Sequence, residues 1–282
     1  MLPEEPDAIE FSRRMKYVAR AFNVLPLTEA VERLQQDDLP AAAASITFDD
    51  GYADNYRVAM PILKEHGLAA TVFIASGFLN GGRMWNDTII ESVRRARGDT
   101  LNLDEFGTHS LRNFDDRRRA VNVLLTRLKY LPGDEREAAA LKIAASAVDG
   151  PLPVDLMMSS TEVRGLAAGG IDIGAHTINH PILARVASAE ARQEIVGGRD
   201  ALEAILDKHV TLFAYPNGQP TRDFGDEHVD MVREAGFAAA VTTGYGVARS
   251  GTDLYRLPRF TPWDRSNFRF GVRLAQNALG ML

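Results

Sequence analysis

The chain has 282 residues, 45% of them apolar and 25% charged, which is the composition of a globular protein large enough for one sizeable core. The formal net charge of −6 argues against a nucleic-acid partner, and no apolar run is long enough to span a membrane. The absence of cysteine excludes disulfide bonds and thiolate metal ligands, but it leaves the cellular compartment open.

Short apolar runs alternate with helical patterns along the chain, and this alternation predicts an α/β protein. Helices are predicted over 7–22, 28–36, 53–66, 87–97, 115–130, 134–148, 187–208 and 226–236. Strands are predicted over 41–48, 70–75, 166–173, 210–214, 239–243 and 256–260. We expect one domain over residues 1–282, with a helical insertion at about 86–150 after the second strand. Polar motifs at the strand ends favour a parallel barrel.

The first of these motifs is Asp49-Asp50-Gly51, which follows the apolar run at 45–48. Adjacent residues on a regular strand point to opposite faces, so both carboxylates can reach one site only where the strand ends. Taken alone, the triplet is more typical of a simple turn, in which glycine allows a positive φ and aspartate bonds the backbone.

The second motif contains His176 and His180, which follow another apolar run at 171–175. Their i, i+4 spacing predicts two imidazoles on one side of a helical turn, although such pairs are also common on helix surfaces. Two strand ends with complementary ligand types favour a metal site. One aspartate and two histidines supply three ligands and leave positions open for water, and the other aspartate is free to act as a general base.

Three segments in this order resemble the motifs of the polysaccharide deacetylases, also called the NodB-homology family or carbohydrate esterase family 4. They are residues 47–51, 176–181 and 213–218, and the resemblance spans roughly residues 40–265. It implies a distorted, incomplete (β/α)7-type barrel. It also implies an enzyme that removes N-acetyl groups from amino sugars of a poly- or oligosaccharide and releases acetate.

The same resemblance assigns roles to the polar residues of the first two motifs. Asp49 would be the general base, while Asp50, His176 and His180 would bind one divalent metal ion. Zinc suits two histidines and one aspartate, and cobalt or another divalent ion would also fit.

In the third motif, Tyr215, Pro216 and Asn217 would bind substrate, with the backbone N–H of Asn217 donating to the oxyanion. In isolation this segment would be interpreted as a turn. Late in the chain, the resemblance implies an arginine that orients the catalytic aspartate. Arg259 is our choice and Arg256 the alternative, because strand alternation does not settle which arginine points inward.

A glycine-containing loop after the second strand precedes Trp85 and Asp87, both candidate substrate-binding residues. Trp85 could stack on a sugar ring or pack the insertion, and Asp87 could bond the sugar or, as we favour, cap a helix that starts at Thr88. The remaining histidines are expected at the surface: His66, His109, His209 and His228.

The histidine that serves as general acid in the resembled family has no counterpart, because the chain has no histidine before His66 or after Pro262. In the permuted exopolysaccharide N-deacetylase branch, which the chain resembles, that histidine precedes the first motif. Residues 1–7 resemble the end of a loop after such a strand. We therefore expect an N-terminally truncated chain, periplasmic or membrane-associated when complete, whereas the sequence as written, without a signal peptide, predicts a cytoplasmic protein.

Two other functions would use the same residues. A related C–N hydrolase would act on a small cyclic amide through a narrower pocket. A glycan-binding pseudoenzyme would keep the metal and the groove but lack the general acid. The oligomeric state is left open by the sequence.

Overall fold

The computed structural model describes residues 7–261 and 266–278 and divides the chain into two compact units. The barrel unit comprises the described residues up to Asn80 and from Met157 onward, and the insertion unit comprises residues 81–156. The loop expected before residue 7 lies outside the described residues. No described helix is both long enough and apolar enough to cross a membrane.

The barrel unit contains seven of the described helices: α1 (Ala8–Ala21), α2 (Leu27–Gln35), α3 (Met60–Glu65), α7 (Ser160–Ala168), α8 (Ser188–Leu206), α9 (Asp226–Glu234) and α10 (Asn267–Ala278). Its described strands are β1 (Asn23–Val24), β2 (Ala43–Ala44), β3 (Thr47–Phe48), β4 (Thr71–Ile74), β7 (Asp172–Ala175), β8 (Leu212–Ala214) and β9 (Ala239–Val241). A π-helical segment, Asn55–Ala59, leads into α3. Short 3-10 turns lie at Ser76–Phe78, Leu183–Arg185 and Leu254–Arg256.

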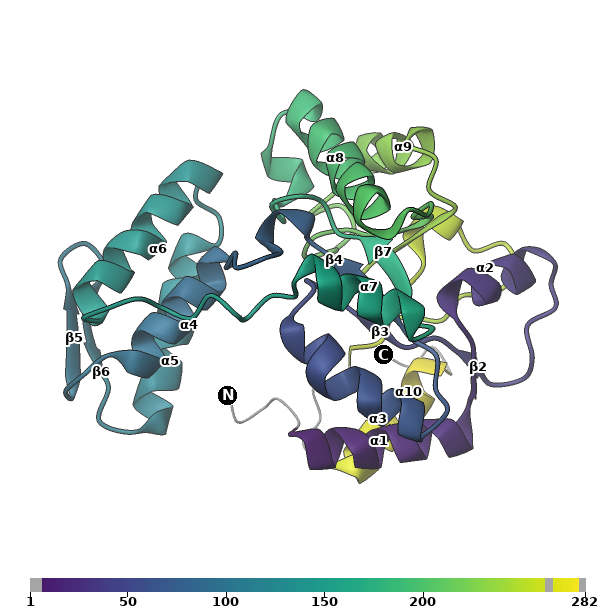
Figure 1. Ribbon diagram of the computed structural model, residues 1–282, viewed down its shortest axis with the longest axis horizontal. Helices are drawn as coiled ribbons and strands as arrows, with labels where there is room; N and C mark the ends of the chain where they lie inside the picture. Colours follow the sequence, from purple (N-terminus) through teal and green to yellow (C-terminus); the bar gives the residue numbers. More distant parts are fainter. Residues whose placement is uncertain (1–6, 262–265, 279–282) are drawn as a thin grey trace. The chain divides into compact units, whose positions relative to one another are not determined.

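Five strands form one parallel sheet in the order β3-β4-β7-β8-β9, curled into a half-barrel. Helices α3, α7, α8 and α9 lie around this sheet (Figure 1). Because the strands are parallel, their carboxyl ends meet at one edge, where the three sequence motifs emerge. The predicted distorted, incomplete barrel is therefore confirmed.

Strands β4, β8 and β9 are buried on both faces, as expected for a parallel sheet covered by other elements. On one face Ile74 and Phe213 pack with apolar residues of α3, α7, α8 and α9. On the other face Phe73 and Leu212 pack with apolar residues of α2. Helix α2 thus covers the face that the other helices leave open.

The first and last predicted strands differ from the structure. The predicted strand at 41–48 is two short strands, because β2 pairs with β1 whereas β3 pairs with β4. At 256–260 the described chain makes only one parallel bridge, Leu257 with Val241, and Pro258 has no N–H with which to extend a ladder. Five strands, rather than about seven, therefore form the sheet within the described residues.

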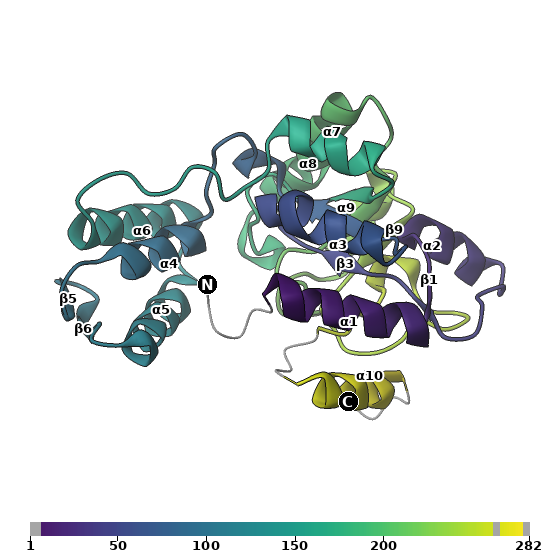
Figure 2. The same cartoon turned by 60° about the horizontal axis from the view of Figure 1, so that its bottom comes forward.

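Two further segments were not predicted correctly. Leu166 lies in α7, which starts with a capping box between Ser159 and Glu162, so the strand before His176 begins only at Asp172. Helix α10 is absent from the prediction. It lies beside α1 in both overall views (Figures 1 and 2), and Phe270 of α10 contacts Tyr17 of α1 with ring centroids 6.1 Å apart.

The insertion unit contains α4 (Trp85–Arg95), β5 (Thr100–Leu103), β6 (Gly107–Ser110), α5 (Phe114–Leu128) and α6 (Gly133–Ala147). It has its own apolar core, which includes Ile89, Leu124 and Ile143. The antiparallel hairpin β5–β6 was not predicted, although Leu101 and Leu103 alternate with exposed residues in the way a half-buried strand requires.

Candidate metal centre and active site

The Asp49-Asp50-Gly51 segment forms a sharp turn directly after β3. Asp50 and Gly51 have positive φ angles of 74° and 89°, and the carbonyl of Asp50 accepts the N–H of Ala75 at 3.2 Å. A Cβ on Gly51 would lie 2.9 Å from Cγ2 of Ile74, so both the backbone angle and the space require glycine. The turn ends the strand's alternation, and both carboxylates can therefore serve one site.

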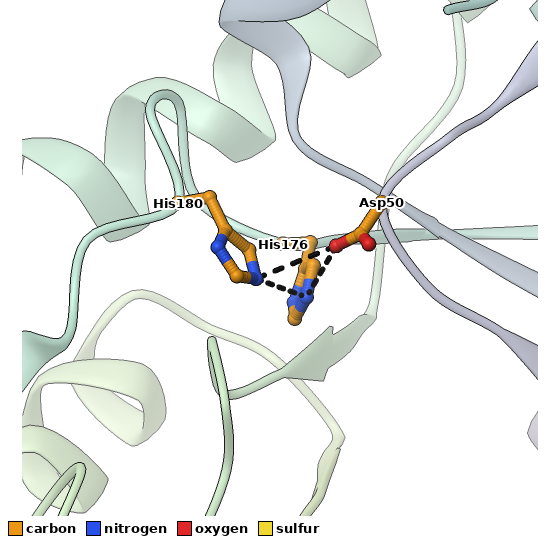
Figure 3. A group of neighbouring side chains, drawn as sticks. All are labelled: Asp50, His176 and His180. Atoms are coloured by element: carbon orange, nitrogen blue, oxygen red, sulfur yellow. Dashed lines mark hydrogen bonds and ion pairs between the residues drawn. The ribbon is translucent and has the colours of Figure 1, made fainter. Parts of the chain in front are cut away.

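Asp50, His176 and His180 offer three ligand atoms to one point (Figure 3). Asp50 Oδ1 lies 3.5 Å from Nε2 of His176 and 3.4 Å from Nε2 of His180, and the two nitrogens are 3.1 Å apart. Ligand atoms bound to a tetrahedral zinc ion at its usual bond lengths lie about 3.3–3.5 Å from one another. The three side chains can therefore hold a metal ion.

His176 is buried, and the backbone fixes the orientation of its ring. Its Nδ1–H donates to the carbonyl of Ala214, at the end of β8, at 2.7 Å, which leaves Nε2 toward Asp50. Burial by itself would lower the pKa of His176, but the hydrogen bond to Asp50 and the two nearby carboxylate charges outweigh it and raise the pKa. A carbonyl on the far nitrogen is the usual support for a metal-bound imidazole.

The two histidines do not lie on a helical turn, as their spacing predicted. The segment after β7 is an irregular loop in which Thr177 and His180 have positive φ angles of 66° and 53°. The hydroxyl of Thr177 accepts the N–H of His180 at 3.0 Å. Loop geometry, rather than helical periodicity, therefore brings the imidazoles together.

A buried glutamate, Glu194 of α8, bonds this loop, and the sequence interpretation did not identify it. Its carboxylate accepts the N–H groups of Ile178 and Asn179 at 2.9 and 2.7 Å. A signal was present, because Glu194 is three or four residues from Ala191 and Gly198 on the buried face.

Arg259 binds Asp49 through two parallel hydrogen bonds. Its Nη1 and Nη2 each donate to one carboxylate oxygen at 2.8 Å, and its Nε donates to the carbonyl of Thr242 at 2.8 Å. Burial alone would raise the pKa of Asp49, but the charge and hydrogen bonds of Arg259 hold it below its usual value. The alternative, Arg256, instead pairs with Asp226 and Asp253.

The third motif contributes backbone rather than side chains. Tyr215 is fully buried, stacks on Phe224 and donates its hydroxyl to the carbonyl of Tyr255 at 3.0 Å, so its side chain packs in the core, and substrate binding by this residue stays a prediction. Pro216 is buried as well. Asn217 has a positive φ of 59°, and no described residue accepts its backbone N–H.

Trp85 and Asp87 both belong to the insertion unit. Trp85 packs against the core of that unit, and the guanidinium of Arg136 lies 5.3 Å from its ring centroid. Helix α4 begins at Trp85 rather than Thr88, so Asp87 lies buried within its first turn and is not its N-cap, which corrects that prediction. Contact of either residue with a sugar stays a prediction.

Of the other four histidines, His228 departs from the expected surface position. It is buried, accepts the N–H of Gly225 at Nδ1 and donates from Nε2 to the carbonyl of Leu183. Its role is to hold the start of α9. The imidazole of His66 contacts the hydroxyl of Ser12, 3.0 Å away. Among the described residues, none of these four bonds to the aspartates of the site.

Comparison with known sequences gives one family and one curated relative. The model of the polysaccharide deacetylase family matches residues 36–117 and 135–240, together more than half of the chain. A Bacillus subtilis (strain 168) protein named as a polysaccharide deacetylase, YxkH, is 22% identical over 252 residues, which are 89% of this chain. The chain spans only 63% of the length of that relative.

Three solved structures, two of them named as a deacetylase or de-N-acetylase, share the fold. The Streptococcus pyogenes deacetylase PplD, solved with acetate, is 20% identical at a TM-score of 0.58, over 92% of this chain and 86% of that one. IcaB from Ammonifex degensii is 18% identical at 0.60, over 96% and 89%. A de-N-acetylase from Aggregatibacter actinomycetemcomitans is 16% identical at 0.62, over 97% and 91%. The family model matches most of the barrel unit, and the three motifs of the chain meet at one edge of its sheet. The chain therefore belongs to the polysaccharide deacetylase family.

Proposed function

We propose that this chain is a metal-dependent hydrolase that removes N-acetyl groups from amino sugars of a poly- or oligosaccharide and releases acetate. One observation carries the proposal: Asp49, held by Arg259, is adjacent in the chain to Asp50, which forms a three-ligand group with two histidines. A carboxylate base beside a metal site is what hydrolysis of an amide requires. The family of the chain supports an acetylated glycan as the substrate.

The donor set fits zinc. Two imidazole nitrogens and one carboxylate oxygen are ligands that zinc takes in catalytic sites, where a further position stays open. Cobalt would fit the same donors, whereas magnesium and calcium prefer oxygen ligands only.

Each residue of the site would then have a separate role in the reaction. A bound divalent ion would supply a Lewis acid that polarises the acetyl carbonyl and acidifies water. Asp49 would accept the proton of the attacking water. Its lowered pKa keeps it ionised at neutral pH but makes it a weak base, so it needs water that is already acidified. The N–H of Asn217 would donate to the developing oxyanion.

The leaving amine must also receive a proton. No third histidine bonds to the site within the described residues, so we assign this step to Asp49, which holds the proton taken from water. If Asp49 did not pass this proton to the amine, the chain would bind the glycan without removing its acetyl group.

Acetate release from N-acetylglucosamine oligomers, with zinc or cobalt, tests the proposal. We expect release by the wild type and loss of it in Asp49→Asn and in His176→Ala. His209→Ala is the matched control, because this histidine is exposed and bonds only Glu203. Metal binding without release would favour a glycan-binding protein, and release from small cyclic amides alone would favour the related C–N hydrolase. A chain that binds neither metal would refute the proposal.

A further inference from the structure

We propose that Glu194 of α8 is a positioning residue that shapes the ligand loop, residues 177–180, so that His180 faces Asp50 and His176. The inference rests on the proposed function only in taking these three side chains as metal ligands. Glu194 itself contacts none of them; it acts on the backbone between the two histidines.

The carboxylate of Glu194 accepts hydrogen bonds from the centre of the ligand loop. Its Oε2 accepts the backbone N–H groups of Ile178 at 2.9 Å and Asn179 at 2.7 Å, and its Oε1 accepts Nδ2 of Asn179 at 2.8 Å. Glu194 is only 6% exposed. Within the part of the chain that the structure describes, no arginine or lysine pairs with it. These three donors are its hydrogen-bond partners, so its charge is directed entirely at the loop.

The ligand loop needs such support because its backbone is strained. Thr177 and His180 adopt left-handed φ angles that residues with side chains rarely take, and they flank the two N–H groups that Glu194 binds. Backbone N–H groups that lose their partner inside a protein are costly. Without the carboxylate, the loop is expected to relax to ordinary angles, which would turn His180 away.

The same helix also fixes the position of the loop sterically. A Cβ on Gly198 of α8 would lie 2.7 Å from the carbonyl of Thr177. Outside this helix, in the 3-10 turn Ser76–Phe78, a Cβ on Gly77 would lie 2.9 Å from the carbonyl of Ile178. Gly198 is one helical turn after Glu194 and on the same face. Helix α8 therefore contacts the loop in two ways. At Gly198 the absence of a side chain lets the two backbones approach closely, and the carboxylate of Glu194 accepts the N–H groups of the loop.

The consequence is a ligand set arranged before any ion arrives. If the loop relaxes, binding must first order it again, and the affinity for metal falls. Loss of such supporting contacts lowers metal affinity by about 10- to 100-fold. A residue that served only general stability would change the unfolding transition and leave the affinity of the folded protein unchanged.

Cobalt titration of the purified chain tests this inference, with the visible absorption of bound cobalt as the signal. We expect Glu194→Ala to bind cobalt about 10- to 100-fold more weakly and with an altered spectrum. Glu194→Gln should lie between this variant and the wild type, because its amide oxygen can still accept backbone N–H groups. If Glu194→Ala does not fold, the Gln variant carries the test.

Glu203→Ala is the matched control. Glu203 lies on the same helix, and its carboxylate also accepts a backbone N–H, that of Val210 at 3.0 Å, but in a loop without ligands. This variant should bind cobalt like the wild type. Equal cobalt affinity in the Glu194 and Glu203 variants would overturn the inference.

A metal-free measurement separates this inference from the proposed function. Hydrogen exchange at the amides of Ile178 and Asn179 should quicken in Glu194→Ala and stay unchanged in Glu203→Ala, whether or not the wild type binds cobalt. A wild type that binds neither cobalt nor zinc refutes the proposed metal site. Unchanged exchange in Glu194→Ala refutes the positioning of the loop.

Discussion

The two segments that carry the site are held by different means. The Asp49-Asp50-Gly51 turn is fixed by a glycine with a positive φ that packs against Ile74 and by the hydrogen bond from the N–H of Ala75, directly after β4, to the carbonyl of Asp50. The histidine loop is also bonded to the segment after β4, through the N–H groups of Ser76 and Gly77, and it depends in addition on helix α8, which supplies the carboxylate of Glu194 and the close approach at Gly198. The aspartate turn contains the glycine that its backbone requires and can be recognised in the sequence, whereas the glutamate that bonds the histidine loop lies outside the histidine motif and is identified only in the structure.

The largest expected effect concerns Arg259, the remote partner of the Asp49 carboxylate. Arg259→Ala should lower acetate release by about 100-fold, because Asp49 loses both bonds that orient it. Cobalt affinity should change little, since Arg259 touches no ligand. Arg256→Ala, which removes surface pairs only, serves as the control. A fall in cobalt affinity equal to that in activity would show that the aspartate turn is not independent of Arg259.

A smaller effect is expected where the histidine loop meets α8. Gly198→Ala raises helix propensity by about 1 kcal/mol, yet its Cβ would meet the backbone of Thr177. We expect cobalt affinity to fall by about 10-fold while the helix itself is not weakened. Gly197→Ala is the matched control, because its Cβ would meet only the flexible end of Ile178. Equal affinities in the two variants would show that the loop tolerates displacement.

The smallest expected effect is the pH dependence of the Asp49–Arg259 pair in the metal-free protein. The pKa of Asp49 is lowered from 3.8 in the folded state, so the pair stabilises the fold above that pH and the contribution is lost as the pH falls through the folded value. Urea denaturation should show Asp49→Asn less stable than the wild type at about pH 7, with the difference shrinking below about pH 4. A difference that grows toward acid would contradict this sign.

Much of the scaffold follows from sequence patterns. The apolar runs before each motif predict strands that end in polar residues, and the helical patterns of α1, α2, α8 and α9 agree with the structure to within a few residues. The patterns fail where pairing is decided far along the chain. The run at 41–48 is divided between two sheets, and Leu257 forms a bridge where a strand was predicted.

The sequence by itself identified the side chains to which the proposed chemistry is assigned. Asp49, Asp50, His176 and His180 follow strand-like runs, and parallel strands bring such ends to one edge. Their residue types also predict zinc or cobalt for the proposed metal site, because imidazole and carboxylate donors together suit these ions.

Only the tertiary structure decided how these side chains are aimed. It selected Arg259 over Arg256, buried Tyr215, and placed the two histidines in an irregular loop bonded by Glu194 rather than on a helical turn. The physical reason is that side-chain direction depends on partners that the chain brings from far away: Arg259 lies 210 residues from Asp49. Local periodicity specifies which face a residue occupies, but only long-range packing specifies what it meets there.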